Sequence, residues 1–197
     1  MNALLERLRH SLRRHSCQPL AYTAVKGLRY VSGLLAAPFR LRRCDVVGAR
    51  ARVRGRLVIE NAGRIEIGED ANIVSSFAPV HLTAGPVGRL QIGRNVMINF
   101  GAKITARSGV RIGDRVSFGP HVEIDDTDRR GRSVPIQIGD DVWLPVRVRV
   151  AAGVTIGSGT VVMAGSVVTE SLPPGVIAGG NPAVVVRPRG RTASTAA

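Results

Sequence analysis

Side chains that can move a proton near neutral pH are few in this chain. Of its four histidines, two lie near the N-terminus, and His81 and His121 lie further along. A neutral imidazole can both accept and release a proton at this pH. His121 precedes a polar stretch, residues 125–137, in which Asp126 and Asp128 could orient a base or bind a hydroxyl group. We take His121 as the candidate general base. The alternatives are that His121 is only an exposed residue at a corner, and that the two aspartates only keep a surface loop solvated.

A repeat of six residues must position these side chains, because it runs through most of the chain. Bulky apolar anchors recur at this spacing: Ile67, Ile73, Ile92, Ile98, Ile104, Ile112, Phe118, Ile124, Ile138, Leu144, Val150, Ile156, Val162 and Val168. Small or β-branched residues such as Val96, Ala102 and Thr160 follow four positions after an anchor. A period of six fits neither an α-helix nor alternating strands, but it fits a prism with flat sides of six residues.

Three such sides make a coil of about 18 residues, and stacked coils pair through parallel ladders around an apolar column. A glycine after the anchor, as in Gly68 and Gly139, suits a corner where the backbone bends and favours a positive φ. The phase breaks at residues 79–91, 105–111 and 125–137. The last of these stretches is polar, and we expect it to protrude from the prism as a functional loop.

The two ends of the chain differ from the repeats. Residues 1–45 are basic and amphipathic. Leucines recur there at helical spacing: Leu4, Leu5, Leu8 and Leu12. This segment has no unbroken apolar core of a secretory signal, and Lys26 and Arg29 interrupt its longest apolar stretch. We expect a helix that lies on an anionic membrane surface or caps the prism or a neighbouring subunit, with a mobile arm as the third possibility. The β-helix domain is expected over residues 46–186, and a basic, mostly disordered tail over residues 187–197.

Composition narrows the partners and the compartment. The net charge of +14, from 28 Lys and Arg against 14 Asp and Glu, should attract anions. Nucleic acid is not an expected partner, because the chain has no recognised motif for it and only 4% aromatic residues. Cys17 and Cys44 are too few for a disulfide framework and fit a reducing compartment. No Cys and His cluster indicates a metal site. We expect a cytoplasmic protein without a metal, peripheral on the inner face of the membrane if residues 1–45 bind lipid.

Over residues 55–187 the sequence resembles the hexapeptide-repeat acyltransferases, most closely the polysaccharide and sugar O-acetyltransferases. The resemblance rests on Gly139-Asp140-Asp141-Val142-Trp143, Ala164-Gly165-Ser166-Val167-Val168-Thr169 and Gly180-Asn181-Pro182-Ala183. It implies an all-β fold, a left-handed parallel β-helix of hexapeptide repeats, here with an N-terminal helical segment. It also implies a homotrimer with active clefts between neighbouring prisms. The implied reaction moves an acetyl or other acyl group from acetyl-CoA, the co-substrate, to a hydroxyl or amine of a sugar or polysaccharide precursor.

The resemblance also assigns residues to the two substrates. The candidate coenzyme A contacts are Trp143, Ala164, Gly165, Thr169, Arg187 and Arg189. The two arginines match residues that contact the phosphates, because a guanidinium fork donates hydrogen bonds in pairs. The alternative for them is a solvated basic tail. Asn99 matches an asparagine on the acceptor side of the cleft, unless it is simply a corner residue that tolerates left-handed geometry.

One position departs from the family pattern. In this family a histidine takes the proton from the sugar hydroxyl and returns it to the leaving thiolate, and it ends a D-x-D-x-H stretch. Here the stretch is Asp126-Thr127-Asp128-Arg129-Arg130, and Arg130, which stays protonated at neutral pH, stands at the histidine position. His121 is the replacement base under the enzyme hypothesis. The competing hypothesis is a catalytically silent hexapeptide-repeat scaffold. A metal-dependent β-helix enzyme of the carbonic anhydrase type needs three histidines, and the repeats hold only two.

Overall fold

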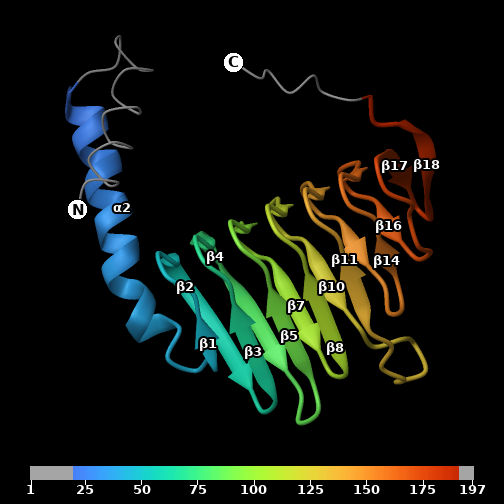
Figure 1. Ribbon diagram of the computed structural model, residues 1–197, viewed down its shortest axis with the longest axis horizontal. Coiled ribbons are helices and arrows are strands. Elements are labelled where there is room, and N and C mark those ends of the chain that lie inside the picture. The colour runs from blue at the N-terminus through green and yellow to red at the C-terminus, as the bar shows by residue number, and fades with distance from the viewer. Residues whose placement is uncertain (1–19, 191–197) are drawn as a thin grey trace.

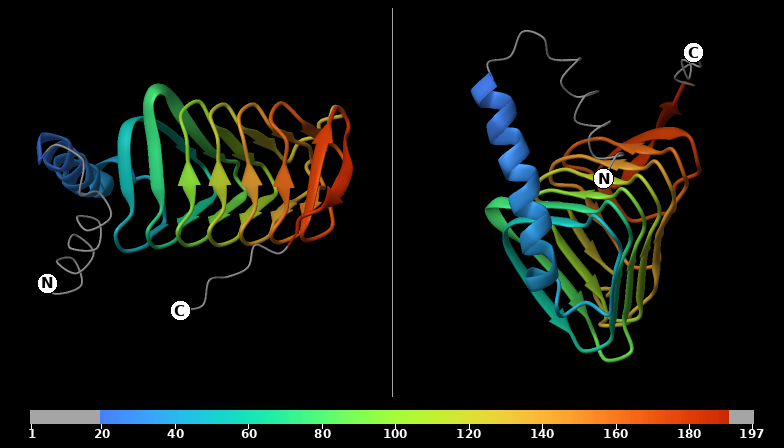
Figure 2. Two further views of the ribbon diagram at one scale, coloured as in Figure 1. Left: turned by 90° about the horizontal axis from the view of Figure 1, so that it is seen from above. Right: turned by 60° about the vertical axis from the view of Figure 1, so that its left-hand side comes forward.

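The computed structural model describes residues 20–190 as a triangular β-helical prism with one helix at its N-terminal end (Figures 1 and 2). The prism is a left-handed parallel β-helix of about 6 turns, as the repeat and the resemblance predicted. The predicted helical leucines Leu4 to Leu12 and most of the predicted tail lie outside the described residues. Within the described range, α2 (Leu20–Arg40) precedes the strands β1 to β18.

The prism has three faces. Face 1 consists of β1 (Val46–Val47), β3 (Arg64–Ile67), β5 (Arg89–Ile92), β8 (Gly109–Ile112), β11 (Ile136–Ile138) and β14 (Thr155–Ile156). Face 2 consists of the first parts of β2 (Arg52–Asn61) and β4 (Asn72–Ala84), then β6 (Met97–Ile98), β9 (Ser117–Phe118), β12 (Trp143–Leu144), β15 (Val161–Val162), β17 (Val176–Gly180) and β18 (Ala183–Pro188). Face 3 consists of the second parts of β2 and β4, then β7 (Lys103–Ala106), β10 (Glu123–Asp125), β13 (Arg149–Val150) and β16 (Val167–Val168). These pairs are parallel, except that β18 folds back antiparallel on β17.

The predicted anchors fill the interior of the prism. Each one is buried, with Leu144 and Ile156 fully so. The small residues four positions later are buried too, and they include the polar side chains of Thr160 and Ser166. The Thr160 hydroxyl donates a hydrogen bond of 2.8 Å to the carbonyl oxygen of Pro173, which offsets the cost of burying it. The period-six prediction is therefore confirmed.

Each edge of the prism joins two faces and takes their two numbers. At the 1–2 edge, the predicted positive φ of the glycines after the anchors is wrong. The positive φ falls two residues later, as at Asp70 and Asp141. Gly68 is required for another reason, because a Cβ atom there would lie 2.6 Å from the carbonyl carbon of Gly93 in the next coil. These glycines allow close stacking of coils rather than an unusual backbone conformation.

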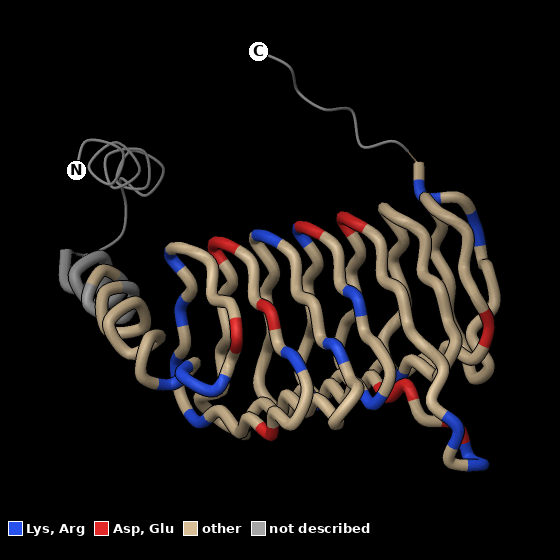
Figure 3. The backbone as a smooth tube through the Cα atoms, turned by 60° about the horizontal axis from the view of Figure 1, so that its bottom comes forward, with Lys and Arg blue, Asp and Glu red and all other residues tan. Residues whose placement is uncertain are grey.

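Ion pairs follow the 1–2 edge from coil to coil. Arg94 donates to Asp114 at 2.7 Å, and Arg115 donates to Asp141 at 2.7 Å. Figure 3 shows basic and acidic residues succeeding one another along this edge. Each arginine hydrogen-bonds the carboxylate of the following coil, so these pairs fasten neighbouring coils together.

Two features break the regular outline. The corner of β4 between faces 2 and 3 reaches beyond its neighbours (Figure 2). The register pairs Gly55 with Ser75 and Leu57 with Val80, so β4 carries three residues more than β2 at this corner. The other feature is the loop between β10 and β11, which protrudes at the 3–1 edge as the sequence predicted (Figure 1).

The end of α2 packs on the first coil of the prism. Ala37 and the following Leu41 are buried in the same core as the anchors. Arg43 donates a hydrogen bond of 3.1 Å from Nη1 to the carbonyl oxygen of Ile59. In the described part of the chain, no helix is both long and apolar enough to cross a membrane.

Candidate active site

His121 lies at the 2–3 edge, on the corner between β9 and β10. Its backbone has a φ of 57°, and its N–H donates to the carbonyl oxygen of Phe100 in the preceding coil at 3.0 Å. The side chain is exposed, as expected for a corner residue. A non-glycine residue in this left-handed region is uncommon and usually costs about 1–2 kcal/mol.

The imidazole of His121 lies against the preceding coil. Its ring meets the Phe100 ring edge to face, with 5.6 Å between centroids and 89° between planes. It also covers Gly101, where an added Cβ would lie 2.5 Å from the imidazole Cε1 and closer still to Nδ1. Within the described part of the chain, no side chain or backbone group hydrogen-bonds the imidazole. The contacts with Phe100 and with the backbone of Gly101 therefore set the position of the ring.

Other sequence candidates share the 2–3 edge with His121. Asn99 lies in the coil before it and is half-buried, and Ala164 and Gly165 lie two coils after it and are exposed. Backbone hydrogen bonds join the corners, since Arg147 N–H donates to Pro120 at 2.9 Å and Gly165 N–H donates to Val146 at 2.9 Å. The edge therefore brings the candidate base, one candidate acceptor residue and two candidate donor residues into one line.

Face 2 borders this edge and carries two more candidates. Trp143 in β12 is 52% exposed and points outward. The register places Val161, Ile177 and then Arg187 beside it on successive strands. At about 4.8 Å per strand, Trp143 and Arg187 are roughly 14 Å apart. This outward strip is apolar in the middle and basic at its end.

The remaining candidates lie elsewhere in the protomer. Asp126, Asp128 and Thr169 lie at the 3–1 edge, which face 3 separates from His121. Arg189 lies near the 1–2 edge, where Nη1 donates to the carbonyl oxygen of Gly159 at 2.9 Å. In one copy of the chain, the structure therefore does not bring these four residues to His121.

Asp126 is a buried carboxylate that fastens one corner. It is 0% exposed. Its oxygens accept hydrogen bonds of 2.7–2.8 Å from the backbone of Arg107, Ser108 and Gly109 and from the Ser108 hydroxyl. These four donors compensate for removing the charge from water. These hydrogen bonds explain why an aspartate occupies this position, and they do not require that Asp126 contacts the substrate.

Asp128 organises the protruding loop. Its carboxylate accepts from the backbone N–H groups of Arg130 and Arg132 at 2.8 and 2.9 Å, and from Arg132 Nε at 2.8 Å. The backbone hydrogen bond from Arg132 and the other bonds to the charged form hold the pKa of this carboxyl below its usual range. Arg130 itself is exposed. Both acids of the stretch are therefore engaged with the backbone of the loop or corner.

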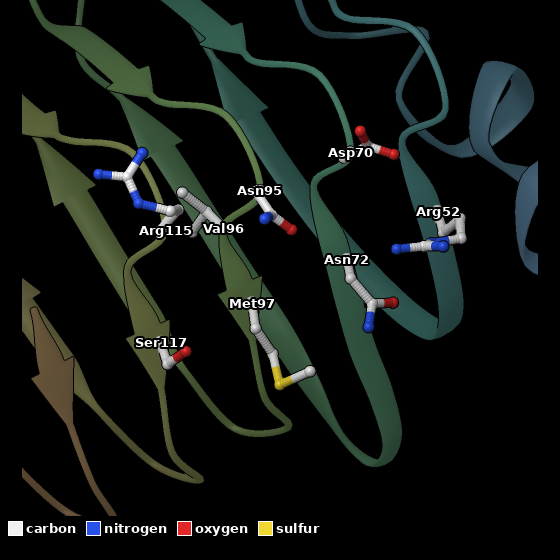
Figure 4. A pocket seen from close by; sticks show the side chains of 8 residues that line it. All are labelled: Arg52, Asp70, Asn72, Asn95, Val96, Met97, Arg115 and Ser117. Atoms are coloured by element: carbon white, nitrogen blue, oxygen red, sulfur yellow. The ribbon is translucent and has the colours of Figure 1, made fainter. Parts of the chain in front are cut away.

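A separate hollow of about 310 Å³ opens on face 2 nearer the N-terminal end. Figure 4 shows Asn72, Met97 and Ser117 on successive strands, with Arg52 beside them on β2. None of the sequence candidates lines this hollow. Within the described residues, no group of three or more His, Cys, Asp or Glu could hold a metal ion.

Sequence reasoning missed Phe77, Phe100 and Gly101. Phe77 meets Phe100 edge to face at 5.2 Å, so the two rings and His121 form a continuous row across three coils. The repeat phase could have identified Phe100 and Gly101, because it places both residues one coil before His121 at the same corner. Phe77 gave no such signal, because it sits in the three extra residues of β4.

Comparison with known proteins agrees with this architecture. Residues 135–170 match the family model described as bacterial transferase hexapeptide (six repeats). The galactoside O-acetyltransferase of Escherichia coli (strain K12) is 39% identical over 119 residues, which are 55% of this chain and 58% of that enzyme. The chain thus spans little more than half of that relative's length. The protein of the same organism named as the colanic acid biosynthesis acetyltransferase WcaF is 37% identical over 129 residues, 52% of this chain and 71% of that protein.

A solved structure covers more of the chain. It is a hexapeptide-repeat acetyltransferase of Vibrio cholerae O1 biovar eltor, complexed with acetyl coenzyme A. It superposes with a TM-score of 0.55 at 26% identity, covering 96% of this chain and 91% of its own. The likeness therefore includes most of the described prism.

Proposed function

Because this chain belongs to the hexapeptide-repeat acetyltransferases, we propose that it transfers an acyl group from coenzyme A to a hydroxyl or amine of a sugar or polysaccharide precursor. The observation that carries the proposal is the 2–3 edge. It aligns His121 with Ala164 and Gly165, and face 2 with Trp143 borders it.

The acyl-CoA donor fits the strip on face 2. The apolar side chains of Trp143, Val161 and Ile177 would contact the pantetheine arm, and Arg187 at the end of the strip would contact the phosphates. Ala164 and Gly165 are exposed where the strip meets the 2–3 edge. The thioester would reach His121 along this edge. Arg189 borders the strip on the side of the 1–2 edge, where Nη1 donates to the carbonyl oxygen of Gly159. Thr169 lies at the 3–1 edge and would contact the donor only from a neighbouring copy.

His121 would move the proton in the transfer. A nitrogen of the neutral imidazole accepts the proton of the acceptor hydroxyl, whose oxygen attacks the thioester carbonyl carbon. The new C–O bond forms, the C–S bond breaks, and the imidazolium returns the proton to the leaving thiolate. An amine acceptor needs only its unprotonated form and correct placement, since that form is already nucleophilic.

The assembly would be a homotrimer. In one copy, face 3 separates the loop that holds Asp128 from His121, so only a neighbouring copy could bring such a loop to the 2–3 edge. Sedimentation should give three copies per particle, and a 20.9 kDa species alone would contradict the trimer.

We further propose that α2 contacts an anionic membrane surface. Val31, Leu35 and Phe39 are exposed along one side of α2, and Arg40 and Arg42 follow them. Apolar and basic groups together favour an anionic lipid surface. Binding to vesicles containing phosphatidylserine should weaken with salt. Equal binding after Leu35→Ser and Phe39→Ser together would contradict the contact.

A catalytically silent scaffold is the second candidate function. It is favoured by Arg130, which stands on the loop where the resemblance implies a histidine. Under this hypothesis the wild-type protein binds coenzyme A but transfers nothing.

The deciding experiment measures free thiol and acylated product from acetyl-CoA with a panel of sugars. Wild type should form product, and His121→Asn should lower kcat by roughly 10²- to 10⁴-fold, the usual effect of removing a general base. Asparagine tolerates the left-handed backbone at this position. Arg115→Asn is the matched control, since Arg115 has a φ of 56° in the same coil but lies at the 1–2 edge. Coenzyme A binding without product in wild type would favour the scaffold, and an unchanged rate in His121→Asn would remove His121 as the base.

A further inference from the structure

His121 divides the 2–3 edge into two different surfaces. On its C-terminal side lie Val146 and then Ala164 and Gly165, the side assigned above to the acyl donor. On its N-terminal side lie Phe100 and then Phe77. In a transfer reaction the acceptor must reach the same base over a surface that the donor does not occupy. The aromatic side of His121 provides that surface.

Phe77 is held out from the prism by the shape of β4. The three extra residues of this strand widen the corner, both relative to β2 and relative to the next coil, where Ile73 pairs with Ile98 and His81 with Lys103. Figure 2 shows this corner reaching beyond its neighbours. The Phe77 side chain is 85% exposed, and its ring meets Phe100 at an interplanar angle of 70°.

Such an exposed ring contributes little to folding. Its apolar area remains in water, so its burial does not stabilise the chain. The row of rings is also narrow, since it follows one corner through three coils and ends on the imidazole of His121. These features suit a small ligand beside a reacting group better than a broad protein interface, which is usually about 800 Å² on each side.

We propose that Phe77 and Phe100 form a platform for the apolar C–H face of a pyranose acceptor, which then presents a hydroxyl or amine to His121. The negative face of an aromatic ring attracts the weakly positive C–H groups on one side of a sugar ring. Asn99, half-buried beside Phe100 in the same corner, can hydrogen-bond a sugar hydroxyl. This proposal rests on the proposed acyl transfer and adds the residues that hold the sugar ring of the acceptor.

The test uses the full chain and two measurements. In steady-state kinetics, Phe77→Ala should raise the KM for the sugar acceptor about 5- to 10-fold, the scale of one aromatic contact, and leave the KM for acetyl-CoA unchanged. Phe77→Trp should keep the low KM. In saturation-transfer difference NMR with methyl β-galactopyranoside, irradiation of aromatic protons should reach the ring C–H protons in wild type, and this transfer should be clearly weaker in Phe77→Ala.

Val87→Ala is the matched control, because Val87 is also 85% exposed but lies in the turn between β4 and β5 at the 3–1 edge. It should change neither measurement. An unchanged acceptor KM in Phe77→Ala, or no saturation transfer in wild type, would overturn the platform. A lower sedimentation coefficient for Phe77→Ala would also overturn it, by showing that Phe77 contacts a second copy. Because the NMR measurement needs no turnover, saturation transfer without product would reject the acyl transfer and keep the platform.

Discussion

Gly101→Ala tests whether the backbone before His121 sets the position of the imidazole. The added Cβ would lie 2.5 Å from Cε1 of His121, whereas carbon atoms normally approach to about 3.5–4.0 Å. The ring must therefore move by about 1 Å or more, and it loses its edge-to-face contact with Phe100. A displacement of this size at a reacting group costs about 10²-fold in rate. We expect kcat to fall about 100-fold while the KM for acetyl-CoA stays within twofold of wild type.

The substitution also strains the backbone, so stability needs its own control. Gly101 has a φ of 71°, and a left-handed alanine costs about 1–2 kcal/mol, or about 2–8 °C in Tm for a chain of this length. Gly175→Ala shares that cost, because Gly175 has a φ of 68°, but a Cβ there meets nothing within 4 Å. Both variants should lose stability, whereas only Gly101→Ala should lose kcat. Equal kcat values in the two variants would refute the claim that the position of the imidazole limits the rate.

Three further predictions concern the stability and reactivity of the prism. Asp126→Ala leaves four partly buried hydrogen-bond donors without their acceptor, so the free energy of unfolding should fall by about 3 kcal/mol, measured by urea denaturation; a loss below about 1 kcal/mol would contradict this role. The hydrogen bond from Arg115 lowers the pKa of Asp141 in the folded protein, so this pair stabilises the fold above the unfolded pKa of about 3.9 and that stability is lost as pH falls through the lower folded pKa. Asp141→Asn should accordingly flatten the fall of Tm below about pH 4, and an unchanged slope would count against the ion pair. Burial raises the pKa of the Cys44 thiol to about 12, so in a Cys17→Ser background the native protein should react with N-ethylmaleimide at pH 8 far more slowly than the urea-unfolded protein.

The repeat made the fold predictable, because each coil obeys one local rule. An anchor such as Leu144 must be apolar because its side chain points into the prism, and the apolar residues at a period of six show these positions directly in the sequence. The corners were predicted less well. The sequence placed the left-handed residue at the glycine after the anchor, but the structure places it two residues later, at positions such as Asp141. A glycine is needed there because a Cβ atom would clash with the backbone of the next coil. The sequence of a single repeat does not reveal this contact between coils.

The candidate site was predictable only in part. The corner position of His121 follows from its repeat phase, and so does its alignment with Ala164 and Gly165. The role of Asp126 does not follow, because its hydrogen-bond partners belong to the corner of the preceding coil. Phe77 was equally hidden, since three extra residues in β4 interrupt the phase and leave no pattern to read.

A structure of the protein with bound coenzyme A would test the central claim most directly. The quantity to measure is the distance from the coenzyme A sulfur to the nearest His121 imidazole nitrogen in the assembly. We expect about 3–4 Å, the reach of a proton transfer, with the pantetheine arm over Trp143 on face 2. A sulfur atom on the 3–1 edge beside Arg130, with no His121 of any copy within reach, would contradict the account.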